Sequence, residues 1–163
     1  MFAARSAARP LLFAVVVLSS SVAIAWAEAP LPLTEIKVTS SADGTEQPSL
    51  LWAPDNADKR ATPLLILLHT WSGDYRQKAS LEYQKQAVKR GWVLLLPNFR
   101  GPNKRPEACG SKLARTDIID ALDYVLANYR VDRQRVYLAG ASGGGHMTLL
   151  MAGYYPQRFS AVS

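Results

Sequence analysis

Apolar and polar residues follow each other in blocks that predict strands alternating with helices. Continuous apolar runs at 64–68 and 92–96 are typical of strands buried on both faces of a sheet. A third short strand is expected at 136–139, and a further one begins near Phe159. Helices are expected over about 76–90, from Thr116 or Asp117 to Tyr129, and from His146 onward.

The first predicted elements have a different pattern. Residues 35–39 alternate polar and apolar side chains, a turn signal follows at 42–45, and 49–52 fits a returning strand. This pattern predicts an antiparallel hairpin. Because the later strands alternate with helices, we expect an α/β fold with a mostly parallel sheet and flanking helices, preceded by that hairpin.

The N-terminus has the pattern of a secretory signal peptide. Arg5 and Arg9 precede a largely apolar run at 11–24, and Ala25-Trp26-Ala27 provides a small-residue cleavage pattern. We therefore expect a signal peptide at 1–27 and a domain at 28–163, in a secreted or periplasmic protein that leaves the membrane after cleavage. The alternative is an uncleaved N-terminal membrane anchor.

Composition and charge exclude several classes of function. The 163 residues are 48% hydrophobic with a formal charge of +6, which argues against a disordered chain. The basic residues are scattered among acids, so no nucleic-acid partner is expected. One cysteine excludes an internal disulfide, and no Cys/His group has zinc spacing. No metal or cofactor is predicted, and the oligomeric state stays open.

The chemistry is concentrated in Gly140-Ala141-Ser142-Gly143-Gly144, a G-x-S-x-G motif between a predicted strand and a predicted helix. In this context the motif predicts a nucleophile elbow, a strained turn that exposes the serine hydroxyl. Gly140 and Gly144 keep the turn small, and the Gly143 N–H would stabilise a developing oxyanion. The alternative is a phosphate-binding turn, but neither G-x-x-x-x-G-K-[ST] nor G-x-G-x-x-G is present.

A second oxyanion donor is expected from the loop after the earlier buried strand. That loop begins His69-Thr70-Trp71, and the backbone N–H of Thr70 or Trp71 is the candidate. Trp71 could instead be a substrate wall or a packing residue. His69 would shape the loop.

Several motifs follow one another along the chain in a recognisable order. They are Asp43-Gly44-Thr45, the 69–73 loop, Pro97-Asn98-Phe99-Arg100-Gly101, the segment 131–136, the elbow and Tyr155-Pro156-Gln157-Arg158-Phe159. Their order resembles the α/β-hydrolase fold, and the set is similar to the catalytic domain of the prolyl oligopeptidase family of serine peptidases. It is also similar to secreted feruloyl and acetylxylan esterases. The resemblance implies a serine peptidase that works by acyl transfer on a peptide, or alternatively a carboxylic-ester hydrolase.

The main departure from this pattern concerns the catalytic triad, which runs Ser, then Asp or Glu, then His along the chain. After Ser142 there is no acid and only His146, which is too close in sequence to act as the base. We therefore expect an incomplete domain, truncated after the elbow helix and inactive alone. A non-catalytic pseudoenzyme or binding protein is the remaining alternative.

Arg100 and three aspartates of a predicted helix are further charged residues that could have a function. Arg100 follows a buried strand at the edge where ligands gather, so it is a possible substrate contact, although an ion pair within its loop is the simpler role. Asp117, Asp120 and Asp123 lie on one polar helix face. We expect them to be solvated and not to bind a metal.

Overall fold

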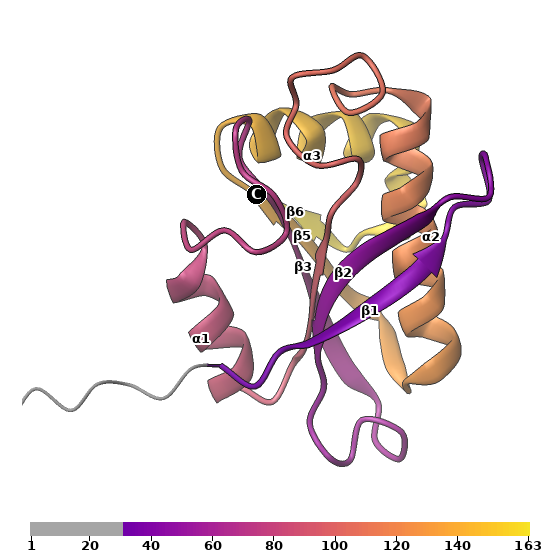
Figure 1. Ribbon diagram of the computed structural model, residues 1–163. Helices are drawn as coiled ribbons and strands as arrows, with labels where there is room; N and C mark the ends of the chain where they lie inside the picture. Colours follow the sequence, from indigo (N-terminus) through magenta and orange to yellow (C-terminus); the bar gives the residue numbers. More distant parts are fainter. Residues whose placement is uncertain (1–30) are drawn as a thin grey trace, which may run out of the picture.

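The computed structural model describes residues 31–163, and its centre is a six-stranded mixed sheet in the order β1-β2-β4-β3-β5-β6 (Figure 1). The predicted signal peptide at 1–27 lies outside the described residues. Strands β3, β4, β5 and β6 are parallel, and the β1–β2 hairpin joins them through an antiparallel β2–β4 pair. The predicted hairpin and mostly parallel sheet are therefore confirmed. The strands are β1 (Thr34–Thr39), β2 (Glu46–Trp52), β3 (Thr62–Leu68), β4 (Val93–Pro97), β5 (Val131–Gly140) and β6 (Ala161–Val162).

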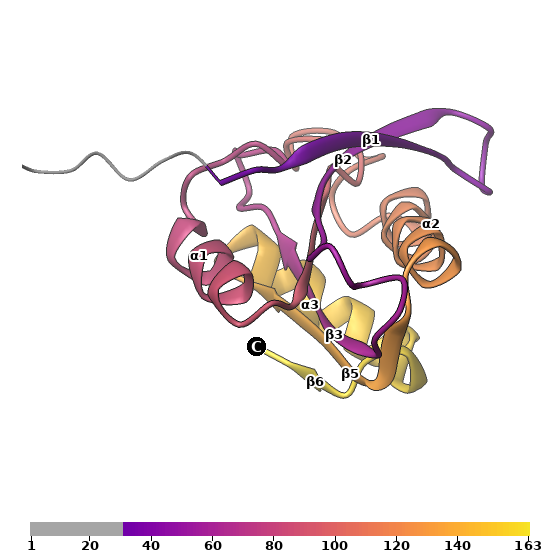
Figure 2. The same ribbon diagram turned by 90° about the horizontal axis from the view of Figure 1, so that it is seen from below.

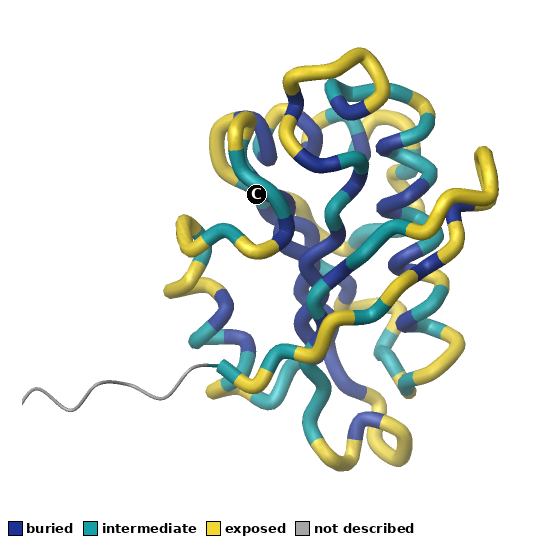
Figure 3. Tube along the Cα trace, viewed as in Figure 1, coloured by how far each residue is buried: buried dark blue, intermediate teal, exposed yellow. Residues whose placement is uncertain are grey.

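Helices cover both faces of the sheet (Figure 2). Leu64, Ile66 and Leu68 of β3 pack with buried residues of α2 and α3 on one face. Leu65 and Leu67 point the other way and pack with α1. This alternation follows from the two-residue period of a strand. Because helices cover both faces, all seven residues of β3 are buried (Figure 3). The helices are α1 (Leu81–Lys89), α2 (Lys112–Asn128), α3 (Gly143–Tyr154) and the short 3₁₀ helix η1 (Pro156–Arg158).

All three α-helices begin at other residues than the sequence predicts. Helix α3 starts at Gly143, three residues before the predicted His146. Helix α2 starts at Lys112, because Ser111 is its N-cap and its Oγ accepts a hydrogen bond from the Ala114 N–H at 3.0 Å. The predicted caps, Thr116 and Asp117, lie inside the helix. Helix α1 starts only at Leu81, after a loop that contains turns.

The end of α1 agrees with the prediction. The helix stops at Lys89, and Gly91 adopts a φ of +66°, the left-handed conformation that commonly ends helices. The chain then enters β4 directly.

The sheet topology brings two loops together at one edge. β3 and β5 are parallel neighbours, and their register pairs Leu68 with Gly140. The loop after β3 and the turn after β5 therefore leave the sheet side by side. Within 31–163, no helix has the length and apolar character needed to span a membrane.

Candidate active site

Ser142 occupies the sharp turn between β5 and α3, as the motif predicts. Its backbone has φ +55° and ψ −117°, a combination that side-chain-bearing residues rarely adopt. Such strain costs about 1–3 kcal/mol and persists only where surrounding structure imposes it. The residue is exposed, so its hydroxyl is accessible at the N-terminus of α3.

The glycines of the turn are required by close backbone contacts. A Cβ atom on Gly140 would lie 2.4 Å from the carbonyl carbon of Gly144. A Cβ atom on Gly144 would lie 2.5 Å from the carbonyl oxygen of Leu68. Because these contacts are with backbone, no side-chain movement can relieve them. The two glycines thus allow the turn to close on itself and to rest on the end of β3.

Gly143 brings the second loop to the turn. A Cβ atom on Gly143 would lie 2.5 Å from the backbone nitrogen of Trp71, so the two residues are in tight backbone contact. Within residues 31–163, neither the Gly143 N–H nor the Trp71 N–H has a hydrogen-bond acceptor. Two unpaired N–H groups beside a serine hydroxyl can stabilise an anionic oxygen, and the N-terminus of α3 adds a favourable dipole.

Thr70, the other candidate donor, is engaged elsewhere. Its backbone N–H donates to Oε1 of Gln77 at 3.0 Å, and its hydroxyl donates to the same oxygen at 2.9 Å. The structure therefore selects Trp71 over Thr70 as the free donor of this loop. Gln77 was missed in the sequence because no motif marks it.

His69 supports the same loop from the inside. The imidazole is buried and stacks on Phe99, with ring centroids 3.8 Å apart and planes within 3°. Its Nε2 lies 2.8 Å from the carbonyl oxygen of Asn98, and its Nδ1 lies 3.0 Å from that of Thr70. A hydrogen on Nε2 donates to the Asn98 carbonyl, and this bond ties the loop after β3 to the loop after β4.

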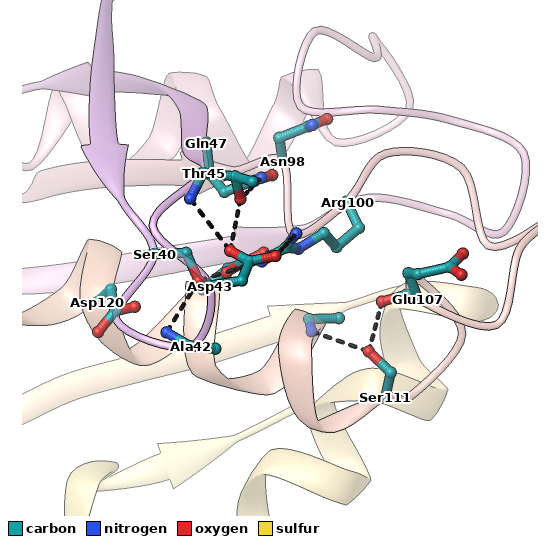
Figure 4. A network of polar contacts seen from close by, with 12 residues as sticks. Ser40, Ala42, Asp43, Thr45, Gln47, Asn98, Arg100, Glu107, Ser111 and Asp120 are labelled. Carbon is teal, nitrogen blue, oxygen red and sulfur yellow. Dashed lines mark hydrogen bonds and ion pairs between the residues drawn. The ribbon is translucent and has the colours of Figure 1, made fainter.

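A buried ion-pair network fixes the loop after β4 (Figure 4). The Arg100 side chain is only 9% exposed and donates to both oxygens of Asp117, at 2.6 and 3.0 Å. It also donates to both oxygens of Asp43, at 2.7 and 3.0 Å, and to the Ser40 hydroxyl. With these contacts Arg100 is engaged within the protein, which argues against the predicted alternative of a substrate contact.

This network makes stability depend on pH through Asp43. Hydrogen bonds from Arg100 and then from Thr45 hold the pKa of Asp43 well below its usual range. A carboxyl with a lowered folded-state pKa stabilises the protein above its unfolded pKa of about 3.9, and this contribution is lost as the pH falls further. We expect Asp43→Asn to unfold more readily than the wild type at pH 7, and the difference to shrink below about pH 4. Urea unfolding at several pH values measures this, and a difference that stays constant with pH would contradict it.

The three aspartates of α2 have partners within the protein. Asp117 is buried against Arg100, so the expectation that it is solvated is wrong. Asp120 accepts hydrogen bonds from the backbone N–H and the hydroxyl of Ser41, and Asp123 pairs with Arg158. The described residues contain no group of three or more His, Cys, Asp or Glu side chains that could hold a metal ion.

His146 is placed near Ser142 without bonding to its hydroxyl. Its backbone N–H donates to the Ser142 carbonyl at 2.9 Å, as expected one helical turn later. The ring instead lies beside Trp71, with centroids 6.5 Å apart. In the part of the chain that the structure describes, no imidazole or carboxylate makes a hydrogen bond to the side chain of Ser142.

Asn103 is a further residue that the sequence did not single out. Its backbone N–H donates to the Trp71 carbonyl at 2.8 Å, so it holds the donor residue from the loop after β4. Its side chain is buried, and neither of its polar atoms has a hydrogen-bond partner among residues 31–163. A loop position without periodicity offers no sequence signal for such a contact.

Comparison with known proteins finds one matching family and several similar proteins. A model of the prolyl oligopeptidase family matches residues 79–163. The acetylxylan esterase of Coprinopsis cinerea is 31% identical over 121 residues, which cover 68% of this chain and 32% of that protein. Feruloyl esterase B of Talaromyces funiculosus is 27% identical over 108 residues, 61% of this chain and 31% of that protein.

A third relative is the acylamino-acid-releasing enzyme of Rattus norvegicus, 27% identical over 121 residues, or 69% of this chain and 16% of that protein. The chain thus spans about a third or less of the length of these three relatives.

Solved structures show the same fold. A thermostable esterase aligns with a TM-score of 0.65 and 21% identity, covering 80% of this chain and 40% of its own. An S-formylglutathione hydrolase from Staphylococcus aureus aligns with a TM-score of 0.63 and 20% identity, covering 80% and 56%. The predicted α/β-hydrolase-type fold is therefore confirmed.

Proposed function

This chain belongs to the prolyl oligopeptidase family, and we propose that it is the part of a serine hydrolase that carries the nucleophile, Ser142. The observation that carries the proposal is the strained turn at Ser142 beside the two unpaired N–H groups of Gly143 and Trp71. A phosphate-binding turn would not need a serine held at φ +55°. Backbone strain of this kind clusters at active sites, which favours a catalytic role over the non-catalytic alternative.

The proposed reaction is acyl transfer. Ser142 Oγ attacks the substrate carbonyl carbon and forms a covalent bond, while the carbonyl oxygen becomes an oxyanion held by Gly143 and Trp71. The intermediate collapses, the leaving group departs with a proton, and an acyl-serine remains. Water then attacks this ester and releases the acid and the free serine.

A general base must take the proton from Ser142, because a serine hydroxyl is a weak nucleophile at neutral pH. We place this base, and the carboxylate that orients it, outside residues 31–163, since no described side chain of either type bonds to Ser142. Residues 31–163 alone are accordingly expected to be inactive.

An ester is the favoured substrate class. Two of the relatives reported above are named feruloyl esterase B and acetylxylan esterase, and both names refer to ester hydrolysis. A peptide substrate is the second candidate, supported by the family match and by the likeness to the acylamino-acid-releasing enzyme. The same oxyanion site serves both reactions.

We further propose that the protein is exported. The support is the sequence pattern of residues 1–27, with its basic start, apolar run and small-residue cleavage pattern. The proposed partners are small ester or peptide substrates.

A fluorophosphonate probe tests the proposed function. Such probes react only with a serine that is activated as a nucleophile, so the protein as its source produces it should be labelled. Peptide mass spectrometry should locate the label on Ser142 and not on Ser72 or Ser160, which lie outside the turn. A correctly folded native protein that stays unlabelled would support the non-catalytic alternative and overturn the proposal.

A further inference from the structure

We propose that Gln77 is a positioning residue for the proposed reaction: its side-chain oxygen holds the peptide group of the Trp71 N–H in the orientation that faces the oxyanion site. The inference rests on the proposed function and adds a residue to its machinery. Gln77 acts through Thr70 and not through a contact with the substrate, so it is not itself a catalytic residue.

The Trp71 N–H shares its peptide group with the carbonyl of Thr70. This group is trans, so its N–H and C=O bonds point in opposite directions. The Thr70 carbonyl accepts the Gly73 N–H at 3.1 Å, which closes a turn over residues 70–73. While the turn stays closed, the Trp71 N–H points away from it, toward the contact with Gly143. Rotation of this one peptide group would turn the carbonyl oxygen to the site instead, where it would repel an oxyanion.

The Gln77 side chain keeps this turn closed. Its Oε1 accepts the Thr70 backbone N–H at 3.0 Å and the Thr70 hydroxyl at 2.9 Å. A Cβ atom on Gly73 would lie only 2.4 Å from the same oxygen. One oxygen therefore bonds twice to the first residue of the turn and rests against the last. With the Thr70 N–H and carbonyl both engaged, the peptide groups on either side of Thr70 are fixed.

The turn needs this support because packing gives it little. Trp71 and Ser72, its two central residues, are both exposed. Exposed loops with few buried apolar contacts open more readily than the rest of a fold. Beyond the turn, the Trp71 carbonyl accepts the Asn103 N–H at 2.8 Å, which fixes the following peptide group but not the one that carries the donor.

Gln77 comes from a segment that is itself anchored. Asp74 accepts the Arg76 N–H with its side chain at 2.8 Å and the Gln77 N–H with its carbonyl at 3.1 Å. Tyr75 is buried, its hydroxyl donates to Glu35 of β1 at 3.0 Å, and Arg76 pairs with the same carboxylate. The acceptor oxygen is thus presented to Thr70 by residues tied to the sheet.

Gln77→Leu in the full-length protein tests the proposal, because leucine fills similar space without an acceptor. We expect kcat for a simple acetate ester to fall by about ten- to one-hundred-fold, less than the 10²- to 10³-fold typical of deleting an oxyanion donor outright. KM should stay within about two-fold, since the oxyanion forms only after the substrate is bound. Rates are divided by the folded fraction from circular dichroism, so a purely structural role would leave kcat unchanged.

Gly73→Ala displaces the same oxygen without altering Gln77, and it serves as the second variant if Gln77→Leu does not fold. Gly73 does not have a positive φ, so an alanine there strains no backbone and its methyl group meets the Gln77 oxygen. The same fall in kcat at constant KM is expected. Gln86→Leu is the matched control: Gln86 is also half-buried, and its side-chain amide donates to Glu82 on α1 at 3.0 Å. It should leave kcat and KM unchanged.

The outcomes separate this inference from the proposed function. Wild-type kcat values in both Gln77→Leu and Gly73→Ala would overturn the positioning role and leave the proposed function intact. A raised KM at constant kcat, or an equal fall in kcat in Gln86→Leu, would overturn it as well. A wild-type protein that neither hydrolyses the acetate ester nor takes up fluorophosphonate would instead overturn the proposed function, and the inference with it.

Discussion

Replacing Ser142 by alanine is expected to lower kcat/KM for ester hydrolysis by about 10⁴- to 10⁶-fold in the full-length protein, the loss typical of removing the nucleophile from a serine hydrolase. The variant keeps the backbone of the turn and both N–H donors, so residual activity would measure what they contribute alone. Steady-state kinetics with a simple acetate ester checks the expectation. A loss of less than about ten-fold, far below that range, would mean that another residue performs the attack.

Ser142→Gly separates the chemistry from the fold. Glycine adopts a φ of +55° and a ψ of −117° without the clash that a Cβ atom creates, so the strain at this position is relieved. We expect the same loss of activity as in Ser142→Ala, together with a free energy of unfolding raised by about 1 kcal/mol. Urea unfolding of the three proteins makes the comparison. A glycine variant less stable than the alanine variant would show that the turn is not strained.

The fold could be predicted largely because its signals are local. The apolar run at 64–68 is long enough to mark a strand buried on both faces, and the structure buries every residue of β3. The turn at Ser142 was predictable for the same reason, since the glycines that permit it are neighbours in sequence. Such patterns depend on a few adjacent residues and not on the rest of the chain.

The features that the sequence left open or predicted wrongly depend on contacts between distant residues. The choice between Thr70 and Trp71 as donor is made by the side chain of Gln77, which no motif announces. Asp117 is buried although it lies on the polar face of its helix, because Arg100 reaches it from the loop after β4. The sequence gives each residue but not the partner that changes its role.

Arg100 connects the turn between β1 and β2, and helix α2, to the candidate active site. Its backbone has φ +79° and that of the preceding Phe99 has φ +35°, both unfavourable for residues with side chains. The ion pairs with Asp43 and Asp117 hold this conformation, and it places the Phe99 ring against His69. Through His69, the same packing reaches the loop that carries the Trp71 donor.

Asp117→Ala is expected to lower the free energy of unfolding by about 3 kcal/mol, the lower end of the range for breaking a buried ion pair. The side chain of Asp117 is 1% exposed, and its removal leaves the buried guanidinium of Arg100 with one carboxylate in place of two. Asp43 remains as a partner, which is why the loss should not reach the upper end of that range. Because Arg100 holds the loop behind His69, ester hydrolysis should weaken in parallel.

Asp123→Ala provides the matched control on the same helix. Asp123 also pairs with an arginine, Arg158, but its side chain is 55% exposed, and surface pairs contribute at most about 1 kcal/mol. Denaturant unfolding of both variants should therefore show a loss several times larger for Asp117→Ala. Equal losses in the free energy of unfolding would mean that water solvates Arg100 well enough to replace Asp117. The ion-pair network would then not hold the strained backbone at Phe99 and Arg100.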